Sequence, residues 1–184
     1  MDKNFFKPYR IGLIAIIFIS CSITFYKFHK IILHPTEYYL SGGGDAYKTY
    51  FCGMYHIKYD STYHHSQQMN HPYGDHINFI DIQPVVVNFM KFLSNIFDYD
   101  LSDYYIPAID YFILISLTIA AILLYFLLVN LRLPVWYSVI LSIAITYLSP
   151  QIARFNGHFG LSYIFVIPTI LYLLHKFEIN RSFK

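Results

Sequence analysis

Charged residues are scarce in this chain, and the motifs that mark most soluble enzymes are missing. Only 13% of its 184 residues are charged, and the formal charge of +2 is too small to indicate nucleic-acid binding. The sequence contains no glycine-rich nucleotide fingerprint, no phosphate loop, no nucleophile elbow and no paired Cys-x-x-Cys motif. It also has no internal repeat and no low-complexity tract. These absences exclude the classes of protein that such motifs identify.

Apolar residues are abundant instead, and they come in long blocks. They make up 56% of the chain, and the 19 Tyr and 17 Phe suit anchoring at the level of lipid headgroups. We therefore predict an all-α membrane protein. A helix rises about 1.5 Å per residue and the lipid core is about 30 Å thick, so the first block is barely long enough and the last two are marginal. The predicted transmembrane helices are 11–28, 106–131, 134–149 and 159–175.

The distribution of Lys and Arg predicts the orientation of these helices. By the positive-inside rule the short segments rich in these residues face the cytoplasm. Both termini, 1–10 and 176–184, are then cytoplasmic, while the long loop 29–105 and the turn 150–158 are outside. The inner segments are too short to fold a domain, which argues against cytoplasmic nucleotide chemistry. The basic residues assigned to the inner side are Lys3, Lys7, Arg10, Arg132, Lys176, Arg181 and Lys184.

The two cysteines predict two free thiols. Cys21 falls inside the first apolar block and Cys52 in the polar loop, so a disulfide between them would require Cys21 to leave the bilayer. The first block follows a basic N-terminus, as in a secretory signal. No small-residue cleavage pattern follows it, however, so we expect an uncleaved anchor.

The last third of the loop has the pattern of an amphipathic helix, which we place at 84–97. It begins at Pro84 and separates an apolar face from a polar one that includes Asn88 and Lys91. Two interpretations remain open: a helix lying in the membrane interface, or a helix packed on an extramembrane core. The apolar face consists of Val85, Val86, Phe89, Met90, Leu93 and Phe97.

Asp45 is the first candidate functional residue. It directly follows the glycine run 42–44, close to where the first helix leaves the membrane. A carboxylate in that position is suited to act as a general base toward a hydroxyl or to hold a divalent cation such as Mg²⁺ or Mn²⁺. The alternative is structural: Asp45 caps a helix that begins at Ala46. The two interpretations are compatible, because a capping carboxylate can also face a ligand.

Two further groups of polar residues are candidates for substrate binding. Asp75, His76 and Asp81 follow a Pro-Tyr-Gly turn, but their spacing matches no recognised metal site. Positioning a polar substrate is the more plausible function for the two acidic residues. Arg154 and His158 lie between the third and fourth helices, on the same predicted side as Asp45, where they suit an anionic headgroup such as a phosphate. The alternative for this pair is a turn with an arginine that extends to the interface.

Three segments of the chain carry a resemblance to a known class. They are the early Gly-Asp of the loop, Asn-His-Pro-Tyr-Gly-Asp-His-Ile-Asn at 70–78 with Asp-Ile-Gln-Pro at 81–84, and Arg-Phe-Asn-Gly-His-Phe at 154–159. In this order the chain resembles the N-terminal part of bacterial polytopic glycosyltransferases of the GT-C class. The resemblance implies a location in the bacterial plasma membrane, and either further downstream helices or a partner subunit.

The resemblance also implies a reaction. Such enzymes take a sugar from a polyprenyl-phosphate donor, and an acidic residue of the first outer loop acts as the base or metal partner; Asp45 is the matching position. Asp75, His76, Asp81, Arg154 and His158 would bind substrate. The alternative function is a non-catalytic membrane subunit that binds a lipid-linked glycan or a partner protein. A transporter is a weaker third, because the helices carry few buried charges.

Overall fold

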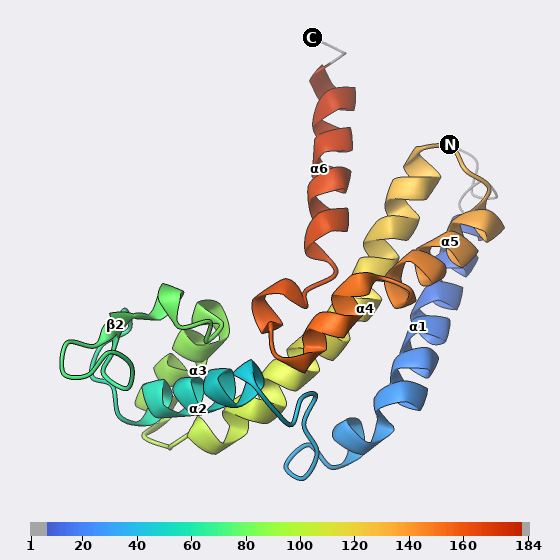
Figure 1. Ribbon diagram of the computed structural model, residues 1–184. Coiled ribbons are helices and arrows are strands. Elements are labelled where there is room, and N and C mark those ends of the chain that lie inside the picture. The colour runs from blue at the N-terminus through green and yellow to red at the C-terminus, as the bar shows by residue number, and fades with distance from the viewer. Residues whose placement is uncertain (1–6, 182–184) are drawn as a thin grey trace. The chain divides into compact units, whose positions relative to one another are not determined.

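The computed structural model describes residues 7–181, and it is that of an all-α, multi-pass membrane protein (Figure 1). Among the described residues, four helical stretches are long and apolar enough to cross a membrane: Pro8–Leu33, Ser102–Asn130, Val135–Asn156 and Phe159–Ile179. The predicted fold class is therefore confirmed. Residues 1–6 and 182–184 of the predicted cytoplasmic termini lie outside the described part of the chain.

The helices follow the apolar blocks, with two shifts. The long helices are α1 (Lys7–Leu33), α4 (Tyr105–Asn130), α5 (Val135–Tyr147) and α6 (Val166–Arg181). Of these, α1 extends beyond both ends of the predicted 11–28, and α6 begins late. The α-helix α6 begins later than the predicted residue 159, because residues 150–161 form two 3-10 turns, η3 (Pro150–Asn156) and η4 (Phe159–Leu161). Pro168 lies in the first turn of α6, where a missing amide proton costs nothing.

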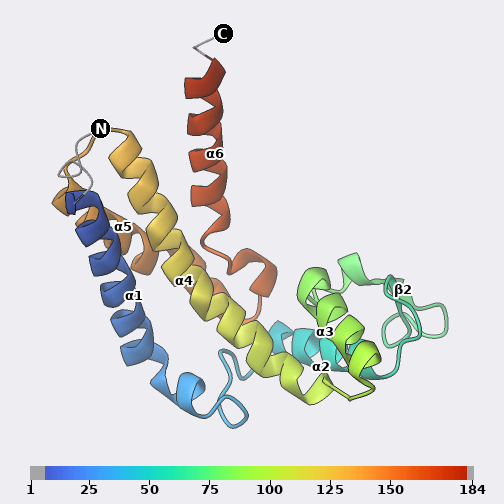
Figure 2. The same ribbon diagram turned by 180° about the vertical axis from the view of Figure 1, so that it is seen from behind.

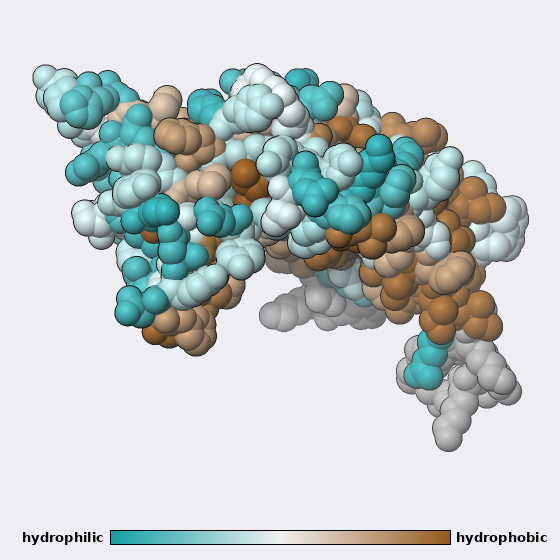
Figure 3. All heavy atoms as spheres, turned by 90° about the horizontal axis from the view of Figure 1, so that it is seen from below, coloured by the Kyte–Doolittle hydropathy of each residue, from teal (hydrophilic) through white to brown (hydrophobic). Residues whose placement is uncertain are grey.

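The chain divides into two compact units, which we describe separately (Figure 2). The membrane unit comprises residues 7–29, 114–152 and 163–181, and the loop unit comprises residues 30–113 and 153–162. The core of the membrane unit is Ile16, Ala121 and Tyr125, packed against apolar side chains of α1, α4 and α5. Many apolar side chains of its helices point outward, as expected for helices in lipid, and Figure 3 shows hydrophobic side chains gathered on one part of the surface.

Hydroxyl groups hold α1, α4 and α5 together inside the membrane unit. The Tyr147 hydroxyl lies 2.7 Å from both Ser20 Oγ and Thr24 Oγ1, and it donates to the Ser20 carbonyl. Ser20 also bonds Thr118 on α4 at 3.0 Å. Such bonds between helices are a main source of association in lipid, where the hydrophobic effect gives no preference for helix contacts. The two cysteines are free, as predicted.

The loop unit is folded rather than extended. It contains α2 (Asp45–Lys58), α3 (Pro84–Phe97), the 3-10 turns η1 (Ile77–Phe79) and η2 (Ser102–Tyr104), and an antiparallel pair, β1 (His65–Ser66) with β2 (Asp75–His76). Figure 1 shows α2 and α3 side by side, and the two helices are in contact. Gly53 of α2 lies against the buried Tyr105 ring, where an added Cβ would be 2.0 Å from a ring carbon, so only glycine fits.

Candidate functional site

Asp45 is the first residue of α2, and its carboxylate does not cap the helix. The N-cap position belongs to Gly44, which has φ 57° and makes no side-chain capping bond. The capping interpretation is therefore wrong, because the positive φ that starts the helix is taken one residue earlier, by a glycine. The Asp45 side chain is exposed. An acidic group in the first turn is also favoured by the helix dipole.

The segment that carries Arg154 and His158 packs directly on the start of α2. A Cβ at Gly157 would lie 3.3 Å from the Ala46 amide nitrogen and 3.5 Å from the Asp45 Cβ. Gly157 has φ 137°, a conformation that other residues rarely adopt. The Asn-Gly pair thus brings this distant segment against Asp45.

Asp81 belongs to the same place. Its carboxylate accepts a bond from Gln83 Nε2 at 3.3 Å, and a Cβ at Gly160 would lie 3.1 Å from its Oδ1. Burial raises the pKa of Asp81, Lys48 and His158 oppose that rise through their charge, and Asp45 adds to it. Two carboxylates and two basic side chains therefore share one electrostatic neighbourhood. We call Asp45, Lys48, Asp81 and His158 the carboxylate site.

Of the six predicted site residues, Asp45, Asp81 and His158 are thus brought together. The other three make contacts elsewhere. Asp75 accepts the amide proton of His76 at 2.9 Å, and His76 Nδ1 accepts that of Asn78. The His76 ring also stacks on His64, with centroids 6.3 Å apart. These contacts shape the hairpin and its turn. The Arg154 side chain is exposed, and the Arg154 carbonyl accepts the amide protons of Gly157 and His158.

A buried carboxylate, that of Asp110, joins the segments that surround the carboxylate site. Asp110 of α4 is fully buried and accepts two bonds, from the Tyr50 hydroxyl at 2.6 Å and from the Leu40 amide at 3.0 Å. The Tyr50 ring lies 5.0 Å from that of Phe159, in the segment that carries His158. Burial, and to a lesser extent the negative charge of Asp110, raises the pKa of Tyr50. Asp110 therefore links α4, the chain before α2 and η4.

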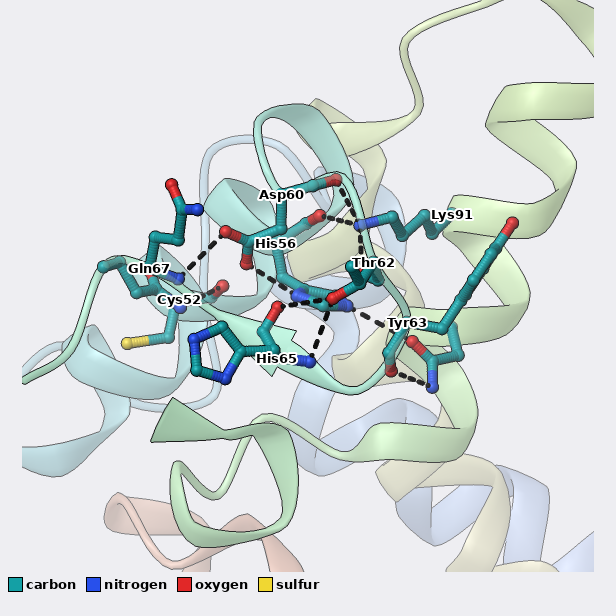
Figure 4. A network of polar contacts seen from close by, with 10 residues as sticks. Cys52, His56, Asp60, Thr62, Tyr63, His65, Gln67 and Lys91 are labelled. Carbon is teal, nitrogen blue, oxygen red and sulfur yellow. Dashed lines mark hydrogen bonds and ion pairs between the residues drawn. The ribbon is translucent and has the colours of Figure 1, made fainter. Parts of the chain in front are cut away.

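A second polar network joins α2 to α3 (Figure 4). His56 is fully buried, and its Nδ1 lies 2.7 Å from Asp60 Oδ2. Burial lowers the pKa of His56, and the hydrogen bond to Asp60 opposes that shift. Lys91 of α3 is 3% exposed and donates to three backbone carbonyls, those of His56, Asp60 and Thr62. This network was not predicted from the sequence, although His56 and Asp60 have the i, i+4 spacing of helix neighbours.

The inward side of α3 carries Val87, Met90 and Lys91, so only part of the predicted apolar face is exposed. Asn88 donates to the Tyr63 carbonyl and Lys91 is buried, whereas Val85 is 83% exposed. Although two apolar residues are buried, α3 exposes more large apolar surface than a helix packed on an aqueous core usually does. This exposure favours the interfacial interpretation, in which the exposed face contacts lipid. The exposed large apolar side chains of α3 are Val85, Phe89, Phe92, Ile96 and Phe97.

The remaining findings bear on metals and on relatives. In the part of the chain that the structure describes, no three or more His, Cys, Asp or Glu side chains are grouped so that they could hold a metal ion. Comparisons with protein-family models, with curated proteins and with solved structures gave no significant match. The carboxylate site must therefore be interpreted from its own chemistry.

Proposed function

We propose that this chain is a membrane glycosyltransferase, or the N-terminal part of one, that moves a sugar from a polyprenyl-phosphate donor to an acceptor hydroxyl on the outer face of the bacterial plasma membrane. The observation that carries the proposal is the carboxylate site. An exposed carboxylate at the start of α2 lies in one neighbourhood with a second carboxylate and two basic groups. Both signs of charge are needed when a hydroxyl attacks a sugar and a phosphate leaves.

In the proposed reaction Asp45 acts as the general base. It takes the proton of the acceptor hydroxyl, whose oxygen then attacks the anomeric carbon and inverts it. The bond from that carbon to the phosphate oxygen breaks, and the electron pair leaves with the polyprenyl phosphate. Lys48 and His158 are suited to stabilise the charge on that leaving group, and Arg154 lies one turn before His158 in the sequence. A lipid-borne donor confines the sugar to the interface, so a fixed carboxylate there gains proximity.

One further feature of the loop unit supports a site at the membrane surface. The exposed apolar face of α3 suits contact with lipid by the unit that also holds the carboxylate site.

Two carboxylates together with a donor phosphate are the ligand set that Mg²⁺ usually takes, so Asp45 and Asp81 fit a divalent cation held jointly with substrate. Such a cation would neutralise charge on the phosphate.

The test is transfer of labelled sugar from polyprenyl-phosphate donors in proteoliposomes, with and without Mg²⁺ or Mn²⁺. We expect Asp45→Asn to lower the rate by at least about 10²-fold, the lower range for a general base. Asp98→Asn is the matched control, because Asp98 is an exposed aspartate of the same unit with φ 49°, which asparagine also tolerates. Wild-type rates in Asp45→Asn would reject the proposed base.

The exposed face of α3 also suits a second function, that of a non-catalytic subunit that binds a lipid-linked glycan or a partner protein. In that case Asp45→Asn leaves function intact, whereas a charge at Phe89 abolishes association. The opposite pattern supports the transferase.

A further inference from the structure

A small cleft opens beside the C-terminal half of α2, away from the carboxylate site. It has a volume of about 190 Å³ and is lined by Phe51, Met54, Tyr55, Lys58, Tyr59, Ser102 and Asp103. Sites for drug-sized ligands have roughly 300–1,000 Å³, so this cleft suits one sugar unit of a longer chain. All of its lining residues belong to the loop unit.

Three aromatic rings form one wall of the cleft. Phe51, Tyr55 and Tyr59 follow each other at i, i+4 spacing, with ring centroids 6.1 Å and then 5.0 Å apart. Phe51 is 61% exposed and Tyr59 is 65% exposed, so the row is not part of the core. A row of exposed ring faces offers flat apolar surfaces to the C–H faces of a ligand, and the tyrosine hydroxyls offer hydrogen bonds at its edges.

The other wall is polar and carries both signs of charge. Lys58 Nζ lies 3.1 Å from Asp100 Oδ2, and the Asp103 carboxylate is exposed beside it. A cationic headgroup in the cleft would meet Lys58, and an anionic one would meet Asp103. A hydrocarbon tail would remove water from Lys58 and Asp103 and offer them no hydrogen bonds. A neutral ligand with many hydroxyls satisfies donors and acceptors of both signs.

We propose that this cleft binds a neutral saccharide. If the proposed transferase function holds, on which this assignment rests, the saccharide is the acceptor glycan. The cleft and Asp45 lie on one helix, and the ten residues from Asp45 to Tyr55 span about 15 Å at 1.5 Å per residue. A short oligosaccharide held in the cleft is long enough to cover that distance.

The experiment measures saccharide binding to the full chain in nanodiscs by saturation-transfer difference NMR. The probes are soluble trisaccharides of glucose, galactose, mannose and N-acetylglucosamine, with phosphocholine as a competitor that represents lipid headgroups. We expect at least one trisaccharide to bind, and Tyr59→Ala and Asp103→Asn each to weaken it roughly tenfold. Tyr73→Ala is the matched control, because Tyr73 is an 81% exposed tyrosine outside the cleft.

Each outcome decides the proposal. Binding that is lost in both cleft variants, kept in Tyr73→Ala and insensitive to phosphocholine supports the saccharide site. Absence of binding by every trisaccharide, equal binding by the variants, or displacement by phosphocholine overturns it. Saccharide binding without sugar transfer would reject the transferase but leave the cleft, whereas transfer without saccharide binding would reject the cleft alone. Asp45→Asn should bind the trisaccharide as the wild type does.

Discussion

Replacing Lys91 by methionine removes the ammonium group that joins α3 to α2 while keeping a long, unbranched side chain in the same space. The three carbonyls of His56, Asp60 and Thr62 then lose their donor. A buried acceptor without a partner costs about 1–3 kcal/mol, so three cost about 3–9 kcal/mol if they add. Methionine avoids burying a charge, which offsets roughly half of that cost. We expect a net loss of about 2–4 kcal/mol in the free energy of opening the loop unit.

Cys52 provides the assay, because this thiol on α2 is 1% exposed and reacts only when the unit opens. Burial also raises the pKa of Cys52, which keeps the closed state unreactive. In a Cys21→Ala background the protein carries a single thiol, and its labelling rate follows the opening equilibrium when closing is fast. A loss of about 2–4 kcal/mol raises the labelling rate roughly 30- to 700-fold.

Lys58→Met is the matched control for this prediction. Lys58 belongs to the same unit but is exposed and makes one surface ion pair, with Asp100 at 3.1 Å. Such pairs contribute little, so the labelling rate of Cys52 should stay within about threefold of the parent. A Lys91→Met rate that also stays within threefold would refute the anchoring function that we assign to the buried ammonium.

Three further predictions concern the frame of the site and the surface of α3. Asp110→Asn places an amide N–H₂ against one of the two donors, the Tyr50 hydroxyl or the Leu40 amide. We expect the free energy of opening at the start of α2 to fall by about 1–3 kcal/mol, which is measured as faster hydrogen exchange. Unchanged exchange would contradict the link. A spin label at Phe89 should collide with oxygen in the lipid and one at Asn95 with a polar relaxation agent; equal access to the polar agent would argue against an interfacial α3. Cysteines at Asp45 and Gly157, whose Cβ positions are 3.5 Å apart, should form a disulfide under mild oxidation, detected by mass spectrometry after digestion. Because the φ of 137° at residue 157 disfavours any side chain, failure to cross-link counts against the contact when Gly157→Ala leaves the labelling rate of Cys52 unchanged.

The sequence predicted the elements that depend on local pattern. The apolar runs of α1 and α4 are long enough to cross a membrane, and α3 has the predicted bounds 84–97 because Pro84 and the apolar period mark them. The period did not indicate which face points inward, since an amphipathic helix has two faces in water and in lipid alike. The start of α6 was also obscured, because the residues before it are as apolar as the helix itself.

The candidate site could be predicted only in part. The glycine run drew attention to Asp45, and the turn at 154–158 to His158. Their proximity depends on Gly157 and Gly160, which pack against α2 and Asp81 from far along the chain. Such contacts leave no periodic signal in one sequence. Two residues predicted to bind substrate, Asp75 and His76, instead make hydrogen bonds within their own hairpin and its turn.

The account requires Asp45 to lie at the outer surface of the membrane, and labelling from one side tests this most directly. Asp45→Cys and Arg132→Cys are each made in a protein whose natural cysteines, Cys21 and Cys52, are replaced by alanine. Cells that produce each variant are treated with a thiol reagent that cannot cross the membrane. Because α4 separates the two positions, we expect residue 45 to react in intact cells and residue 132 only after permeabilisation. Reaction of residue 132 in intact cells, with residue 45 protected until permeabilisation, would contradict the account.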